Sequence, residues 1–186
     1  MKKLFLLLSV VMAVALSGCG SGKNAATSDN AMNSNQAASH EEMEHTGSGE
    51  VPEGLQKAAN PAFPVGSQVT VEADHMPGMK GATATVVGAF DTTAYAVSYT
   101  PKTGGERVTN HKWVIQEEIK DAKENPYPPG ASITITADHM KGMKGAEAVV
   151  DSSGQTTVYM IDYTPTTGGE AVKNHKWVVE DELSAK

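Results

Sequence analysis

The stretch GSQVTVEADHMPGMKGATATV, residues 66–86, returns 64 positions later as GASITITADHMKGMKGAEAVV, residues 130–150. The repeat runs without a gap from 66–114 to 130–178, and more than half of the paired positions are identical. Within each copy, apolar residues alternate with polar ones over short runs that end in glycine or proline. This pattern is typical of β-strands separated by turns. The chain is therefore expected to contain two similar all-β units.

Alternating residues place the strands of each unit. The runs lie at 69–73, 82–86 and 95–99 in the first copy and at 133–137, 146–150 and 159–163 in the second. A last short strand begins at Trp113 in one copy and at Trp177 in the other. Before it, Thr-Pro-x-Thr-Gly-Gly predicts a hairpin loop, because proline presets a turn and glycine allows a positive φ.

Strands this short and numerous predict two tandem small SH3-like barrels, one made by each repeat. The first barrel would occupy residues 55–124 and the second residues 125–186. A brief helix over 117–124 and a stiff, proline-rich linker at 125–129 would join them. Because units of this size are marginally stable alone, we expect the two barrels to pack together.

The N-terminus predicts where the protein resides. An apolar run at 4–16 follows two lysines and is too short for a spanning helix in a mature protein. It ends in Leu-Ser-Gly-Cys, which matches the lipobox of bacterial lipoproteins. We therefore expect residues 1–18 to be a signal peptide and Cys19 to carry a lipid. The lipid would anchor the protein to the outer face of the cytoplasmic membrane of a Gram-positive bacterium.

Residues 19–54 are polar and have little to bury, so they predict a disordered tether between the anchor and the barrels. In this segment His40, Met43 and His45 form either a chance cluster or an accessory metal site. Cys19 is the only cysteine, which excludes a disulfide within one chain and, once lipidated, a thiolate site. Loss of the two lysines of the signal peptide takes the net charge from −7 to −9, which argues against nucleic acid as a partner.

Two motifs that recur in both copies carry a candidate metal site. Four of the six histidines and four of the nine methionines belong to them. Imidazole and thioether ligands together suit copper, above all Cu(I). The candidate ligands are His75, Met76 and Met79, with His111 as fourth ligand, in the first barrel, and His139, Met140 and Met143, with His175, in the second.

Each candidate also has a purely structural interpretation. The methionines can be adaptable filler at one end of a barrel, and the histidines of Asn-His-Lys-Trp can be rim residues. Asp74 and Asp138 either orient the neighbouring imidazoles or cap a turn. Trp113 and Trp177 are expected in the cores. Because no nucleophile, phosphate-loop or zinc-protease signature is present, we expect a binding protein and no enzyme.

The lipobox, the polar tether and the tandem motifs DHMxGMKGA, YTPxTGGE and NHKWV resemble the YdhK family of Gram-positive lipoproteins. The resemblance covers about two-thirds of the chain, from Gly54 to the C-terminus. That family includes the CopL-type surface lipoproteins, so the resemblance implies extracytoplasmic Cu(I) binding in copper resistance. A copper exporter or another copper-handling protein is then a candidate partner.

The main alternative is a cell-wall-binding SH3-like module without a metal role. Such a module needs an exposed aromatic groove. The chain has two Trp, five Tyr and three Phe, and the repeated pairs among them are needed for the cores. The sequence therefore favours copper binding.

Overall fold

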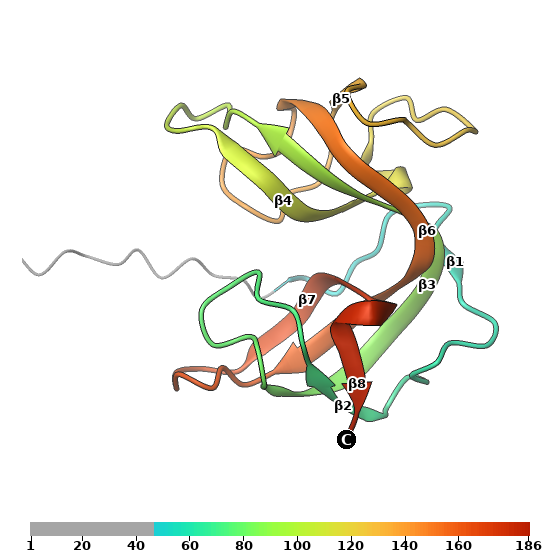
Figure 1. The fold of residues 1–186 in the computed structure, drawn as a ribbon, viewed down its shortest axis with the longest axis vertical. Coiled ribbons are helices and arrows are strands. Elements are labelled where there is room, and N and C mark those ends of the chain that lie inside the picture. Colours follow the sequence, from blue (N-terminus) through green and yellow to red (C-terminus); the bar gives the residue numbers. More distant parts are fainter. Residues whose placement is uncertain (1–46) are drawn as a thin grey trace, which may run out of the picture. The chain divides into compact units, whose positions relative to one another are not determined.

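The computed structural model describes residues 47–186, and these residues form an all-β fold, as predicted (Figure 1). The strands are β1 (Gln56–Lys57), β2 (Gln68–Val71), β3 (Thr83–Tyr99), β4 (Val108–Ile115), β5 (Ser132–Thr134), β6 (Glu147–Tyr163), β7 (Val172–Val179) and β8 (Leu183–Ala185). Two single-turn 3-10 helices, η1 (Gln116–Glu118) and η2 (Glu180–Glu182), follow β4 and β7. Within the described residues, no helix has the length and apolar character needed to cross a membrane.

Part of the predicted organisation lies outside the described residues. The signal peptide, Cys19 and the cluster of His40, Met43 and His45 all fall in 1–46. The last residues of the predicted tether, 47–54, are among those that the structure describes, and they contact the folded domain. The Gly47 amide donates a hydrogen bond to the Lys173 carbonyl oxygen at the edge of β7, at 2.8 Å.

Two long strands organise the sheet. β3 and β6 have 17 residues each and pair antiparallel from Ala84 opposite Tyr163 to Tyr99 opposite Ala148. Figure 1 shows them side by side, bending from one end of the sheet to the other. The predicted pairs of short strands are therefore halves of single strands. The intervening residues continue the ladder, because they too find partners on the opposite long strand.

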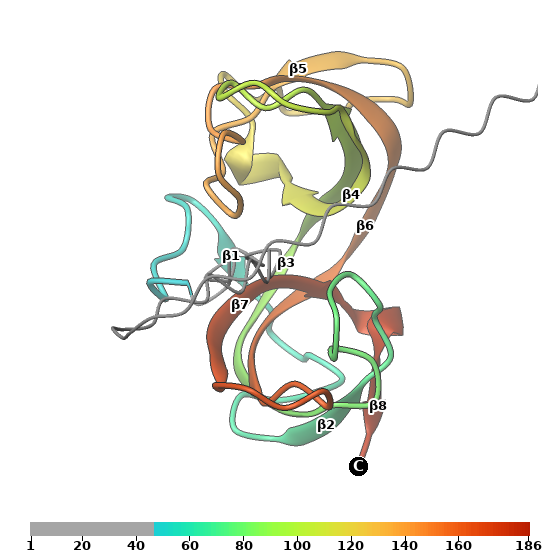
Figure 2. The same cartoon turned by 90° about the vertical axis from the view of Figure 1, so that its left-hand side faces the viewer.

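The two long strands run through two lobes, each of which has its own core (Figure 2). The core of lobe 1 comprises Val69, Val71, Ala73, Met79, Ala82, Ala84, Val86 and Ala89 from the first repeat, with Tyr159, Ile161, Tyr163, Val178 and Leu183 from the second. The core of lobe 2 comprises Tyr95, Val97, Tyr99, Val114 and Ile119 from the first repeat, with Ile133, Ile135, Ala137, Met143, Ala146, Ala148 and Val150 from the second. Each lobe thus contains half of each repeat.

This exchange corrects the expected division into one barrel of residues 55–124 and another of 125–186. Each repeat crosses from one lobe to the other in the middle of its long strand, so neither repeat encloses a core alone. The expected helix over 117–124 is only the single turn η1. The expected linker belongs to lobe 2, since the Tyr127 ring lies 6.3 Å from the ring of Tyr95 in an edge contact.

A third apolar cluster lies at the middle of the long strands. Trp177 is 0% exposed and packs edge-on against Phe90, with ring centroids 5.8 Å apart. Trp113 packs against the same cluster but is only half-buried. The predicted core position is confirmed for Trp177, whereas Trp113 is a rim residue of this cluster.

The loops with the repeated Asp-His-Met motif, residues 74–82 and 138–146, are here called the histidine loops. Glycine turns within them determine where these loops lie. Gly78 has φ +77°, and a Cβ there would lie 2.5 Å from Oγ1 of Thr167, in the hairpin loop of the other repeat. The Gly78 carbonyl oxygen accepts a hydrogen bond from the Thr166 amide at 2.9 Å. Gly142, with φ +80°, meets Thr103 in the same way. Each histidine loop is therefore bound to the hairpin of the opposite repeat.

Candidate functional site

The four repeated histidines line one cleft. It has a volume of about 1270 Å³, and both lobes contribute to its wall. The lining includes His75, His111, His139 and His175, together with Met76 and Met140. One cleft thus collects six of the eight predicted ligands, three from each repeat.

The histidines are grouped across the repeats. His111, on β4, lies 6.4 Å from His139 between ring centroids, and its ring packs edge-on against Tyr99 at 5.9 Å. These residues belong to lobe 2 or border its core. In lobe 1, His175 on β7 packs against Tyr163 at 5.8 Å. The imidazole paired with His111 is thus that of His139, from the loop of the other repeat, whereas the prediction grouped His111 with the loop of its own repeat. His75 of that loop is still near enough to act on the pKa of His111.

A glutamate carboxylate binds each loop histidine, and of the two glutamates Glu118 is buried and Glu182 is half-buried. His75 Nε2 lies 2.7 Å from Oε1 of Glu182, and His139 Nε2 lies 2.8 Å from Oε1 of Glu118. The carboxylate oxygens accept, so in the neutral rings Nε2 carries the proton and Nδ1 carries the lone pair. Nδ1 of both histidines is buried, with no hydrogen-bond partner among the described residues.

The same two carboxylates connect the lobes. Glu182 Oε2 accepts from Trp113 Nε1 at 2.8 Å, and Glu118 Oε2 accepts from Trp177 Nε1 at 3.2 Å. Trp113 lies two residues after His111 on β4, and Trp177 lies two residues after His175 on β7. Each glutamate therefore binds the loop histidine of one lobe and a tryptophan from the histidine strand of the other lobe. Both sites are consequently linked through reciprocal Trp–Glu–His hydrogen bonds.

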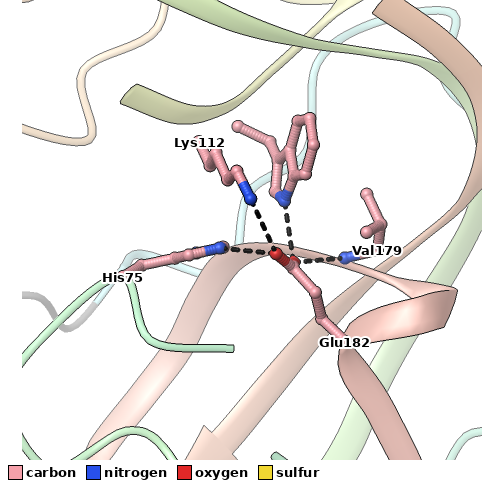
Figure 3. A network of polar contacts seen from close by, with 5 residues as sticks. His75, Lys112, Val179 and Glu182 are labelled. Atoms are coloured by element: carbon pink, nitrogen blue, oxygen red, sulfur yellow. Dashed lines mark hydrogen bonds and ion pairs between the residues drawn. The ribbon is translucent and has the colours of Figure 1, made fainter. Parts of the chain in front are cut away.

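Figure 3 shows the surroundings of Glu182, on which His75, Lys112 and the Val179 amide converge. Burial by itself raises the pKa of this carboxyl. The hydrogen bond and charge of His75 oppose that effect, and the N–H donors of Trp113 and Val179 add to them, so the pKa lies below its usual value. Glu182 is therefore an ionised acceptor at neutral pH.

His111 differs from the loop histidines, because among residues 47–186 no carboxylate is hydrogen-bonded to its ring. Burial first, and then the nearby His139 and His75, lower the pKa of His111 to about 4. The imidazole is thus neutral at pH 7. Its Nε2 is buried and has no hydrogen-bond partner among residues 47–186.

The methionines divide into two kinds. Met76 and Met140 are half-buried at the cleft, and the Tyr99 hydroxyl lies 4.0 Å from Sδ of Met140. Met79 and Met143 are 0% exposed and belong to the two cores, away from the cleft. The structure therefore brings only the first methionine of each loop to the histidines.

Of the two roles predicted for Asp74 and Asp138, the orienting one is taken in the structure by two other acids. Asp74 and Asp138 also border the cleft, but their side chains are exposed, and Glu182 and Glu118 hold the imidazoles instead. The two glutamates are themselves 64 positions apart, four residues beyond the end of the compared frame. Extending the repeat comparison to 118 and 182 would have found them.

The described residues contain no group of three or more His, Cys, Asp or Glu side chains arranged to hold one ion. The six candidate ligands at the cleft divide by the core against which they lie. The rings of His111 and His139 lie 6.4 Å apart, and Met140 packs against the lobe 2 core. Met76 and His175, which contacts Tyr163, lie against the lobe 1 core, and His75, the residue before Met76, lines the same cleft.

Comparison with known proteins places this two-lobed β-repeat protein in a family. The family described as "Protein of unknown function (DUF1541)" matches residues 65–116 and 129–180, one match for each repeat. "Uncharacterized protein YdhK" of Bacillus subtilis is 59% identical over 181 residues, which is 97% of this chain and 87% of that protein. The chain belongs to the DUF1541 family.

Solved structures of YdhK have the same fold. A crystal structure of the Bacillus subtilis protein has a TM-score of 0.76 and 67% identity, covering 79% of this chain and all of that one. A solution structure of its C-terminal domain has a TM-score of 0.64 and 67% identity, covering 67% of this chain and 94% of that one. The resemblance to YdhK is confirmed.

Proposed function

We propose that this protein is an extracytoplasmic lipoprotein that binds Cu(I) in two His/Met sites, one in each lobe, and stores the ion or hands it over. The observation that carries the proposal is the set of buried imidazole nitrogens at the cleft that have no hydrogen-bond partner among the described residues: Nδ1 of His75, Nδ1 of His139 and Nε2 of His111. A buried acceptor without a partner costs on the order of 1–3 kcal/mol. A bound cation would remove this penalty.

The carboxylate contacts support a metal as that cation. Histidines that bind metals commonly donate their second ring N–H to a carboxylate, which fixes the tautomer and the direction of the lone pair. Glu118 and Glu182 stand in this relation to His139 and His75. The low pKa of His111 supports the same conclusion, because a neutral imidazole needs no deprotonation before it binds.

The thioethers of Met76 and Met140 favour copper over zinc. Zinc sites use His, Cys and carboxylate, whereas thioether sulfur is a soft ligand suited to Cu(I). The revised ligand set leaves out Met79 and Met143, which are needed in the cores. Two imidazoles and a thioether are metal ligands and suit storage or transfer, so the proposed role is binding without catalysis.

The location follows from the N-terminal sequence. Lipidation at Cys19 would hold the domain at the outer face of the membrane, where a copper exporter or another copper-handling protein would supply or receive the ion. The cell-wall alternative needs exposed aromatic rings. Tyr95, Tyr99, Tyr159 and Trp177 are instead completely buried, and Tyr163 nearly so.

A titration of the soluble form, residues 20–186, with Cu(I) under reducing conditions tests the proposal. Two ions should bind per chain in competition with a chromophoric Cu(I) chelator. Met140→Leu should weaken one of the two sites by at least the roughly 10–100-fold that the loss of an outer-shell partner costs. Leucine keeps the volume of methionine, so the fold should lose at most about 1.5 kcal/mol.

Met143→Leu is the matched control, since it changes the second methionine of the same loop, whose side chain is fully buried in the lobe 2 core. It should leave both copper affinities unchanged. Absence of Cu(I) binding, or equal weakening by the two variants, would contradict the proposal and favour the cell-wall alternative.

A further inference from the structure

The two halves of the cleft are unequally covered. His175 is 7% exposed, whereas His111, at the equivalent position of the other repeat, is only half-buried. The preceding asparagines follow the same trend, since Asn174 is half-buried and Asn110 is exposed. Because the two Asn-His-Lys-Trp motifs are identical, the difference in exposure must come from another part of the chain.

Residues 47–53, here called the covering segment, lie against β7. The Gly47 amide donates to the Lys173 carbonyl oxygen at 2.8 Å, and the Asn174 side-chain amide donates to the Gly47 carbonyl oxygen at 3.2 Å. The Lys176 ammonium donates to the carbonyl oxygen of Glu50. Most residues of the segment also line the cleft beside His175.

The fit between this segment and β7 is close. A Cβ on Gly47 would lie 2.6 Å from the backbone oxygen of Asn174, a separation that requires the segment to move. Gly49, at φ +79°, approaches the Asn174 side chain, where a Cβ would lie 3.2 Å from Nδ2. Glycine at these two positions allows the backbone to lie directly on the strand.

β4 has no equivalent cover among residues 47–186. The positions 64 residues after the covering segment are 111–117, and these form the end of β4 and the start of η1. The chain therefore contains only one such segment in its described part, and it lies on the half of the cleft that holds His175.

From this asymmetry we infer that the covering segment makes the two proposed copper sites unequal. The lobe 2 site, with His111, exchanges its ion readily, and the lobe 1 site, with His175, is shielded and releases its ion slowly. This inference rests on the proposed function and adds a regulatory element to it. Exchange with a partner protein would then take place at lobe 2.

A chemical test of the cover needs no metal. Diethyl pyrocarbonate modifies accessible imidazoles, and mass spectrometry of the copper-free soluble form measures the rate at each histidine. His111 should react faster than His175. Gly47→Val should displace the segment and bring His175 close to the rate of His111.

Ser48→Val is the matched control, because it places the same side chain at the neighbouring, exposed position. It removes the hydrogen bond from the Glu50 amide to Ser48 Oγ within the segment but none of the three hydrogen bonds to β7. It should leave the rate at His175 unchanged. Equal modification of His111 and His175 in the parent protein, or no effect of Gly47→Val, would overturn the inference whether or not copper binds.

The second test follows the release of copper from the loaded protein to an excess of chelator. Release should occur in two phases of equal amplitude. Gly47→Val should accelerate the slow phase by roughly tenfold or more, since three hydrogen bonds of modest net value hold the segment. A single phase in the parent would refute the inequality alone, whereas failure to load any copper would refute the proposed function.

Discussion

β4 and β7 contain the same Asn-His-Lys-Trp motif, and yet its histidine and tryptophan are buried on β7 and only half-buried on β4. Trp177 is completely buried against Phe90, while Trp113 is half-buried. The residue 64 positions after Phe90 is Gly154, so the second repeat lacks the ring against which Trp113 would pack. This difference at one position matches the unequal burial of the two tryptophans.

The same comparison shows how the chain differentiates two duplicated sites. The covering segment and β1, which pairs with β3 at Phe90 and Asp91, precede the first repeat and have no second copy in the described residues. The duplicated loops and strands are therefore alike, whereas the non-repeated residues before them cover only the strand that carries His175.

The largest expected effect concerns the exchange of half-repeats. Residues 125–186 alone contain only half of each core, so they should not fold as a monomer. Circular dichroism and NMR at low micromolar concentration should show an unfolded chain, which gains β-structure when residues 47–124 are added or when two copies associate. A folded, monomeric single repeat would contradict the interleaved fold.

A smaller effect separates the two tryptophans. Trp177→Phe removes buried ring atoms and a donor to the buried Glu118, so it should destabilise the protein by about 2 kcal/mol. Trp113→Phe also removes a donor, to Glu182, but its ring is only half-buried, so it should cost less, about 1 kcal/mol. Urea unfolding of both variants measures the difference, and equal losses would show that the two halves of the cluster are energetically alike.

The smallest effect comes from restoring the missing ring. Gly154→Phe gives the second repeat the phenylalanine that the first repeat has at Phe90. It should be combined with Ser152→Gly, because a Cβ at the equivalent Gly88 would lie 2.7 Å from the ring of Phe90. An aromatic pair with Trp113 is worth roughly 0.5–1.5 kcal/mol.

The double variant should therefore be slightly more stable than the parent. In a Trp177→Phe background, the fluorescence of Trp113 should also shift to the blue, as expected for a more buried indole. An unchanged spectrum would mean that Gly154 is not the cause of the exposure of Trp113.

The sequence predicted the local structure of this protein well and its connections poorly. Alternation and turn glycines located the strands and the hairpin loops, because each depends on neighbouring residues alone. They could not show that Ala84 and Val97 belong to one continuous strand that crosses between two cores. Since the repeats are alike, pairing within a copy and pairing between copies satisfy the same pattern.

The candidate site shows the same limit. The histidines were found because an imidazole is conspicuous in a repeated motif, and all four line the cleft. The two methionines of each loop looked equivalent, but only packing distinguishes the cleft residue Met140 from the core residue Met143. The carboxylate partners depend on a contact over 107 residues in the case of His75 and Glu182, which no local pattern reveals.

The central claim is that each site joins the histidine loop of one repeat to the strand histidine of the other. Two double variants of the soluble form test it by the number of Cu(I) ions that they bind tightly. His111→Gln with His139→Gln changes one lobe, and should abolish one site and leave the other. His75→Gln with His111→Gln changes one repeat, and should abolish both. The opposite result, with one site left after the second pair of changes and none after the first, would contradict the account.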